Sequence, residues 1–116
     1  MAANIKPQTR LNIYLDGNKE CFYCGRKVKW EEFTIDHVVP RSKGGKSIRN
    51  NYVCCCTDCN SIKGDMPIEQ FNKYINNLHI VMRNDPKWRL FLKHFDVKAK
   101  RKTNFLEKYN NRKKDG

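Results

Sequence analysis

Hydrophobic and polar positions follow a helical pattern near the start of the chain. In the segment 9–16 (TRLNIYLD), Leu11, Tyr14 and Leu15 lie three or four residues apart. This spacing predicts a short amphipathic helix, which Gly17 is well placed to end. We expect the apolar stripe of this helix to pack as a lid on the unit that follows.

Two runs rich in β-branched residues predict an antiparallel hairpin. They cover residues 33–40 (FTIDHVVP) and 51–56 (NYVCCC), and a ten-residue basic loop separates them. A short helix is expected after Cys56, ending at Gly64. Strands and helices in this order predict a small α+β fold.

The second half of the chain returns to helical spacing. A predicted core stripe follows steps of three or four residues, at Ile68, Phe71, Ile75, Leu78 and Met82. A further apolar helical face is expected between Asp85 and Asp96, and residues 98–116 hold eight cations and two anions. We therefore predict one domain, residues 1–116, with a core at 9–65, a helical extension at 66–97 and a basic tail at 98–116.

The charge of the chain points to a polyanionic partner. Lysine and arginine number 24 against 12 acidic residues, which gives a net charge of +12. Nucleic acid is the expected partner, and a soluble basic protein without one is the alternative. The chain has no apolar run of membrane-spanning length and no hydrophobic signal core. We expect a cytoplasmic protein, in a prokaryotic or phage-infected cell, with no membrane partner.

Four of the six cysteines have the spacing of zinc ligands. Cys21 and Cys24 form one C-x-x-C pair, Cys56 and Cys59 form another, and 31 residues separate the pairs. Two such pairs complete a tetrahedral thiolate site, which predicts a structural Zn²⁺ ion. A redox C-x-x-C pair or plain buried thiols are the alternatives, although redox chemistry needs only one pair.

Cys54 and Cys55 directly precede the second pair. Neighbours on a strand point to opposite faces, and only Cys56 has the required spacing to Cys59. We therefore expect Cys54 and Cys55 to pack the hairpin as small apolar side chains.

Asp36, His37 and Asn60 carry the candidate chemistry. If the cysteine pairs share one ion, the hairpin is fixed and these three residues meet at its open end. Carboxylate and amide oxygens suit Mg²⁺, and a histidine near its ordinary pKa can take a proton from water. This combination predicts metal-assisted phosphodiester hydrolysis. Because Asp36 and His37 are strand neighbours, their cooperation requires the phosphate to lie between them at a frayed or bulged strand end.

The motifs together resemble those of an HNH endonuclease of the zinc-knuckle type. The resemblance runs from about residue 9 to residue 65 and rests on the first C-x-x-C pair, IDHVVPRSKGG, NNYVCCCTDCN and KGD. It implies a ββα-metal core (His-Me finger) held by a four-cysteine zinc site, with a helical C-terminal extension. It also implies cleavage of DNA by a Mg²⁺- or Mn²⁺-dependent endonuclease.

By this resemblance each motif residue receives a role. His37 is the general base, Asp36 and Asn60 bind the catalytic divalent ion, and Asn51 orients the base through an amide-to-imidazole or backbone hydrogen bond. Asn51 is preferred over Asn50 because it lies nine residues before Asn60, as in similar sequences. Asn60 stands where the family more often has histidine, which weakens the expected metal affinity.

Cations around this site are expected to bind the DNA backbone. Predicted phosphate contacts come from the loop, the short helix and the tail, at Arg41, Lys43, Lys46, Lys63, Lys100, Arg101 and Lys102. Double-stranded DNA is the expected substrate. One active site cuts one strand, so a monomer nicks and a homodimer would cut both. The alternative is a zinc-ribbon DNA-binding module without catalysis, and a phage or mobile-element origin is a guess from size.

Overall fold

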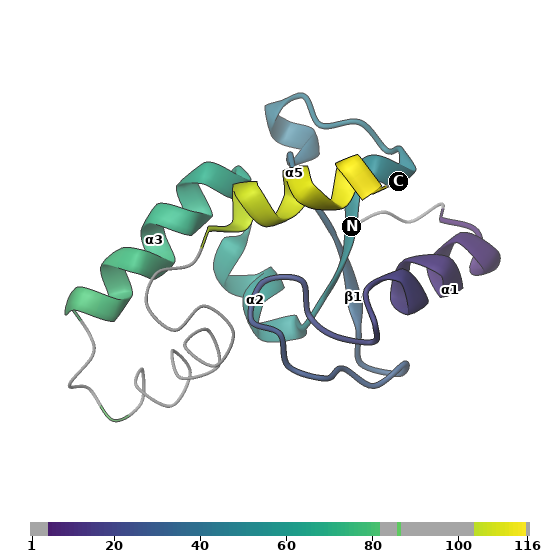
Figure 1. Ribbon diagram of the computed structural model, residues 1–116, viewed down its shortest axis with the longest axis horizontal. Helices are drawn as coiled ribbons and strands as arrows, with labels where there is room; N and C mark the ends of the chain where they lie inside the picture. The colour runs from purple at the N-terminus through teal and green to yellow at the C-terminus, as the bar shows by residue number, and fades with distance from the viewer. Residues whose placement is uncertain (1–4, 82–85, 87–103, 116) are drawn as a thin grey trace. The chain divides into compact units, whose positions relative to one another are not determined.

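The computed structural model of the chain contains two compact units, residues Met1–Pro67 and Ile68–Gly116. Residues 5–81, 86 and 104–115 are described by the structure (Figure 1). The boundary between the units falls two residues after the predicted end of the nuclease core at residue 65. That the two units make up one domain stays a prediction.

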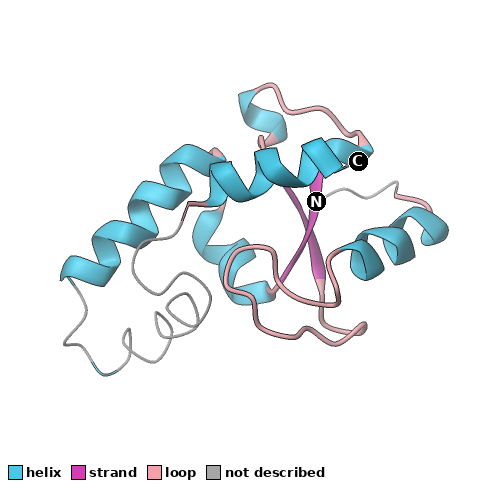
Figure 2. Ribbon diagram, in the orientation of Figure 1, coloured by secondary structure: helices cyan, strands magenta, loops and turns pink. Residues whose placement is uncertain are grey.

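The first unit is built on a two-stranded antiparallel sheet followed by a helix. β1 (Thr34–His37) pairs with β2 (Tyr52–Cys55), so that Asp36 lies opposite Val53 and His37 opposite Tyr52 (Figure 2). α2 (Thr57–Lys63) follows β2 after a single residue. The α+β class and the ββα order predicted from the sequence are confirmed.

Both strands are shorter than the apolar runs that predicted them. Pairing continues for one hydrogen bond beyond β1, where the Val38 amide donates to the Asn51 carbonyl at 2.9 Å. Pro40 then has no N–H to donate. Two short 3₁₀ helices occupy the connecting loop, η1 (Arg41–Lys43) and η2 (Arg49–Asn51). The strand end therefore opens directly into the basic loop.

α1 (Pro7–Asp16) forms where a helix was predicted, and the predicted stripe is buried at Tyr14 but not at Leu11 or Leu15. Leu11 and Leu15 are 37% and 48% exposed, whereas Ile13 and Tyr14 are buried. Tyr14 sets this orientation because its hydroxyl donates to the Val28 carbonyl at 2.6 Å. Its ring also packs on Phe33 and Trp30, and this contact was not visible as a spacing in the sequence.

The second unit contains α3 (Ile68–Val81) and α5 (Phe105–Asp115), which pack on each other. Ile68, Phe71 and Ile75 of the predicted stripe are buried, and the Phe71 and Phe105 rings stack at 5.4 Å. Asn104 begins α5 by accepting a hydrogen bond from the Glu107 amide at 3.0 Å. The side chain of Leu78, Met82 and the predicted helical face at 85–96 lie outside what the structure describes, apart from residue 86.

None of the helices within the described ranges is both long and apolar enough to cross a membrane.

Candidate active site and metal centre

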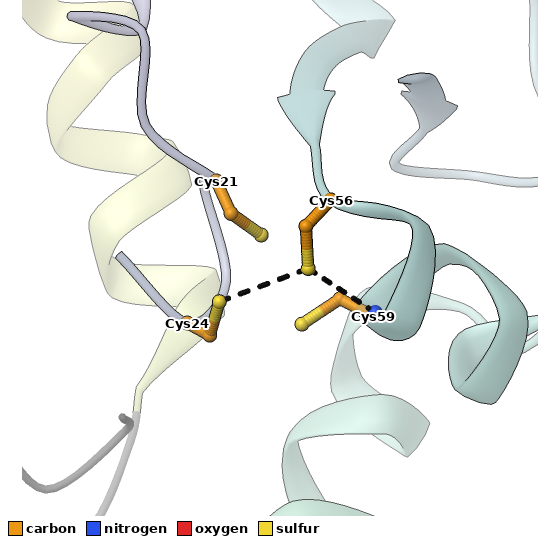
Figure 3. Close-up of side chains that lie close together, drawn as sticks. All are labelled: Cys21, Cys24, Cys56 and Cys59. Carbon is orange, nitrogen blue, oxygen red and sulfur yellow. Dashed lines mark hydrogen bonds between the residues drawn. The ribbon is translucent and has the colours of Figure 1, made fainter. Parts of the chain in front are cut away.

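Four cysteine sulfurs meet beside the end of the sheet. Cys21 and Cys24 lie on the loop before β1, Cys56 precedes α2 and Cys59 lies in its first turn, and their side chains point toward one another (Figure 3). All four sulfurs lie within 4.8 Å of one another, and all four residues are buried. The predicted ligand set is therefore brought together.

The separation of these sulfurs fits a zinc ion. Zn–S bonds of about 2.3 Å in a tetrahedron place the sulfurs about 3.8 Å apart. The Sγ atoms of Cys24 and Cys56 are 3.8 Å apart. Hydrogen bonds from the neighbouring thiols, that of Cys24 first, lower the pKa of Cys21 to about 3, and the pKa of Cys56 is lowered to about 7. Hydrogen bonds with the other three thiols, that of Cys21 first, raise the pKa of Cys59 instead. The spacing of the four sulfurs is therefore the observation by which they could hold a structural Zn²⁺.

Arg26 covers the sulfur cluster on one side. Its Nε and Nη2 atoms lie 3.3 Å from the sulfurs of Cys24 and Cys56, and Nη2 also donates to Asp58 at 2.9 Å. A guanidinium in this position stabilises negative charge on the two sulfurs. It belongs to the partners that tune a metal site from outside the ligand set.

Cys54 and Cys55 lie outside the four-sulfur set, although a side-chain hydrogen bond joins Cys55 to Cys21. Both are buried, and burial raises the pKa of Cys54 to about 12. The six cysteines form no disulfide. Cys54 and Cys55 therefore pack the hairpin as expected.

The Asp36 carboxylate at the strand end is held by two donors. The Tyr23 hydroxyl donates to Oδ2 at 2.6 Å, and the Lys63 ammonium lies 3.1 Å from Oδ2 and 3.4 Å from Oδ1. Burial raises the pKa of Asp36, while Lys63 and the Tyr23 hydrogen bond oppose that shift. Oδ1 thus keeps more capacity for a further ligand than Oδ2.

Lys63 faces the protein interior, although the sequence predicted a phosphate contact for it. Its side chain is 0% exposed, and its ammonium also donates to the His37 carbonyl at 3.0 Å. α2 places it there because Lys63 ends that helix against β1. In this geometry Lys63 links the side chain of Asp36 to the main chain of His37.

His37 is almost fully covered and lies at the mouth of the basic loop. Its ring packs edge-on against Tyr52 at 5.0 Å, and its Nε2 atom lies 3.4 Å from Ser47 Oγ. Burial is the largest influence and lowers the pKa of His37, although Asp36 opposes the shift. This shift favours the neutral imidazole, which is the form that accepts a proton.

Asn51 fastens the loop to the strand end through three hydrogen bonds. Its Oδ1 accepts from the Val39 amide at 2.9 Å, and its Nδ2 donates to the carbonyls of Val39 and Lys46 at 3.0 and 2.9 Å. The sequence offered an imidazole or a backbone contact, and these contacts are all with the backbone. Asn51 therefore fixes the segment that follows His37.

Asp36, His37 and Asn60 line one cavity of about 680 Å³, together with Arg41. The Asn60 amide is oriented by its Nδ2, which donates to Thr34 Oγ1 at 2.9 Å, and Thr34 in turn donates to the Cys55 carbonyl. Strand neighbours with side chains on opposite faces thus reach the same cavity, because the strand ends at His37. The three residues that the sequence grouped are brought together.

Of the predicted loop cations, Arg41 lines this cavity. Arg41, Lys43 and Lys46 are exposed, as a contact with phosphate requires. Gly45 closes the loop against the protein itself, because a Cβ atom there would lie 1.7 Å from the Val39 carbonyl oxygen. The predicted tail contacts Lys100, Arg101 and Lys102 lie outside the described residues.

Tyr23, Arg26, Thr34 and Ser47 take part in the site and were not found in the sequence. Thr34 and Ser47 touch Asn60 and His37 across 26 and 10 positions of sequence, with no pattern that links them. Tyr23 and Arg26 carried a signal that could have been used, since one lies inside the first C-x-x-C pair and the other two residues after it.

Part of the chain is similar to known endonucleases. Residues 21–76 match a family model described as HNH endonuclease. A CRISPR-associated endonuclease Cas9 of Corynebacterium diphtheriae is 39% identical over 51 residues, which are 43% of this chain and 5% of that protein. The crystal structure of the Type II-C Cas9 enzyme from Actinomyces naeslundii superposes with a TM-score of 0.52 at 20% identity, covering 83% of this chain and 11% of that one. The chain thus spans a small part of each relative, and the structural likeness concerns the fold.

Proposed function

Since residues 21–76 belong to the HNH endonuclease family, we propose that this chain hydrolyses phosphodiester bonds in double-stranded DNA with a divalent metal ion. The observation that carries the proposal is the cavity shared by Asp36, His37 and Asn60. A carboxylate, a neutral imidazole and an amide around one space are the groups that metal-assisted hydrolysis uses.

His37 acts as the general base. A hydrogen bond from Nε2 to Ser47 Oγ would leave the Nδ1 lone pair free to accept a proton from water. The water oxygen forms a bond to phosphorus and the P–O3′ bond breaks, so the products carry a 5′-phosphate and a 3′-hydroxyl. One proton goes to His37, and the leaving O3′ takes another from solvent.

Asp36 and Asn60 would hold the divalent ion. Their donor set is one carboxylate and one amide oxygen beside a cavity large enough for water and phosphate, which fits Mg²⁺ or Mn²⁺. When bound, such an ion neutralises charge on the phosphate and the leaving oxygen. Tyr23 holds Asp36 and Thr34 holds Asn60, so both ligands are oriented before metal binds.

The structural Zn²⁺ has a different task. Four thiolates leave no open coordination position, so this ion fixes the fold and does not catalyse. It ties the loop before β1 to the start of α2, and therefore holds Asn60 near the end of β1. Catalytic geometry depends on zinc in this indirect way.

Arg41, Lys43 and Lys46 bind the DNA backbone next to the cavity, and the cations of the C-terminal segment add a second basic region. With one set of Asp36, His37 and Asn60 per chain, a monomer nicks one strand. A double-strand break needs a homodimer or two separate encounters. Target sequence plays no part in these contacts, because they engage phosphate.

A DNA-binding module without catalysis is the competing function. The ion pair between Asp36 and Lys63 is the observation in favour of this module, because a carboxylate can be paired in this way for purely structural reasons. A binding module, however, needs no neutral imidazole and oriented amide beside that carboxylate. We therefore place hydrolysis first.

Relaxation of supercoiled plasmid separates the two functions. Wild-type protein should nick it with Mg²⁺ or Mn²⁺ and not with EDTA, and His37→Ala should lose at least about 100-fold in rate, the usual contribution of a general base. His79→Ala, in α3 and outside the unit that carries the cavity, is the matched control and should nick normally. If wild type and His37→Ala bind DNA equally and neither nicks it with any divalent ion, the module is the correct function.

A further inference from the structure

Lys63 is the buried cation closest to the proposed metal ligand, and no step of the hydrolysis uses it. Its ammonium lies 3.1 and 3.4 Å from the two oxygens of Asp36, and its side chain is fully buried. A lysine is seldom buried this deeply unless its charge is paired. The pair is therefore a permanent part of the site.

This pairing offsets the negative charge of Asp36, which is the one anionic ligand of the proposed pair, since Asn60 is neutral. Two carboxylates, Asp36 and Asp65, and two arginines, Arg10 and Arg41, line the cavity. Lys63 adds a third positive charge at Asp36, so the cations outnumber the anions by one. A divalent ion entering this space therefore meets a net positive charge, which an added anion would offset.

The scissile phosphate is the anion that the reaction itself brings. Mg²⁺ sites in proteins are commonly completed by substrate phosphate oxygens. Because Asp36 is shared between the ion and Lys63, the phosphate has to supply the negative charge that Lys63 neutralises on Asp36. The Asp36 oxygen that Lys63 and Tyr23 engage less, Oδ1, is the one left for the ion.

We propose that Lys63 makes binding of the catalytic divalent ion dependent on DNA: the ion binds weakly to the free protein and tightly once a backbone phosphate occupies the cavity beside Asp36. This inference rests on the proposed function and assigns Lys63 a positioning and charge-setting part in it. Linkage requires that the ion raise DNA affinity by the same factor that DNA raises ion affinity. A coupling of about 10- to 100-fold is the range that such linked sites show.

The test measures binding and not activity. Zinc-loaded protein in a His37→Ala background keeps the DNA intact while Mn²⁺ affinity is determined by electron paramagnetic resonance, with and without a short duplex, and binding by the duplex alone is subtracted. DNA affinity is measured by fluorescence anisotropy at several Mn²⁺ concentrations and constant ionic strength. The two coupling factors should agree and lie between about 10 and 100.

Two variants separate charge from packing at the same carboxylate. Lys63→Met removes the charge, and it should bind Mn²⁺ at least about 10-fold more tightly in free protein and show a smaller DNA effect. Tyr23→Phe removes a neutral hydrogen bond from the same Asp36 oxygen and should not tighten Mn²⁺ binding. Zinc content and circular dichroism report whether each variant is folded. If Lys63→Met does not fold, the inference is judged on the coupling between Mn²⁺ and DNA that is measured with Lys63 present.

Three results overturn the inference. They are equal Mn²⁺ affinity with and without DNA, unchanged or weaker Mn²⁺ binding by folded Lys63→Met, and equal tightening by Tyr23→Phe. Plasmid nicking by the protein with His37 intact distinguishes this failure from failure of the proposed function. Nicking without coupling between Mn²⁺ and DNA binding would refute only the role proposed for Lys63. Absence of nicking would refute the proposed hydrolase activity.

Discussion

Replacing Asn51 with alanine should loosen the loop after His37 more than it damages the sheet. Asn51 makes three hydrogen bonds of 2.9 to 3.0 Å, two to Val39 and one to Lys46. These bonds join the residue just before β2 to Val39, which precedes the basic loop, and to Lys46 in the middle of that loop. Alanine removes all three at once and leaves the strands themselves intact.

The cost of this change can be estimated from the bonds. Each intramolecular hydrogen bond contributes about 0.5 to 1.5 kcal/mol net. Because water can reach the freed loop groups, we expect about 2 kcal/mol of lost stability, near the lower end of the sum. A small unit loses about 1 kcal/mol per molar urea, so the unfolding midpoint should fall by about 2 M.

Urea unfolding of the zinc-loaded protein, followed by circular dichroism, measures this fall. The Val39 amide donates a hydrogen bond to Asn51 Oδ1, so in the variant this amide should lose its protection against hydrogen exchange. Asn12→Ala is the matched control, because Asn12 bonds only to Gln8 on the exposed face of α1 among the described contacts, and its midpoint should not fall.

Asn51→Asp sharpens the test. It keeps the acceptor for the Val39 amide and puts a carboxylate beside the two carbonyls that Nδ2 served. It should therefore be at least as unstable as Asn51→Ala. An unchanged midpoint and unchanged Val39 exchange in Asn51→Ala would show that these bonds do not hold the loop, and the reasoning would be refuted.

Further predictions concern zinc, pH and salt. Metal analysis should find one Zn²⁺ per chain. Because the fold depends on this ion, Cys24→Ser or a strong chelator should unfold the first unit, which is measured as a loss of circular dichroism. A folded, zinc-free protein would contradict this prediction. The nicking rate should rise with pH through an apparent pKa below the ordinary histidine value of about 6.5 and stay level above it, since burial lowers the pKa of His37 and only its neutral form accepts a proton; an inflection above that value would contradict the assignment. Changing Arg41, Lys43 and Lys46 together to glutamine should reduce the slope of log DNA affinity against log salt by about 3, measured by anisotropy. An unchanged slope would mean that these cations do not contact phosphate.

The parts of the fold that could be predicted are those fixed by short-range patterns. The two cysteine pairs fixed which segments meet, and the β-branched runs located both strands. Asp36, His37 and Asn60 could be grouped because each lies within a few residues of a strand end or a cysteine. Local spacing was sufficient to predict a contact wherever residues close together in the sequence also lie close together in the fold.

Prediction failed where a long side chain reached across the fold. Lys63 lies one helical turn after Asn60, which predicted a phosphate contact, yet α2 directs it inward to Asp36 across 27 positions of sequence. In α1 the prediction failed at Leu11 and Leu15 for a related reason, because helical spacing could not show that Tyr14 is buried together with Ile13 and not with these leucines. The hydroxyl of Tyr14 donates to the Val28 carbonyl and so favours the observed orientation.

The guanidinium of Arg26 has a consequence for the chemical durability of the zinc site. Among the four sulfur ligands, Cys56 belongs to the most exposed residue, at 8%, and it is one of the two that Arg26 covers. A thiolate that accepts hydrogen bonds from a cation has its charge partly neutralised and is a weaker nucleophile toward oxidants and alkylating reagents. The sulfur that such a reagent would reach first is thus one of the two whose nucleophilicity Arg26 lowers, so metal loss through cysteine oxidation should be slow.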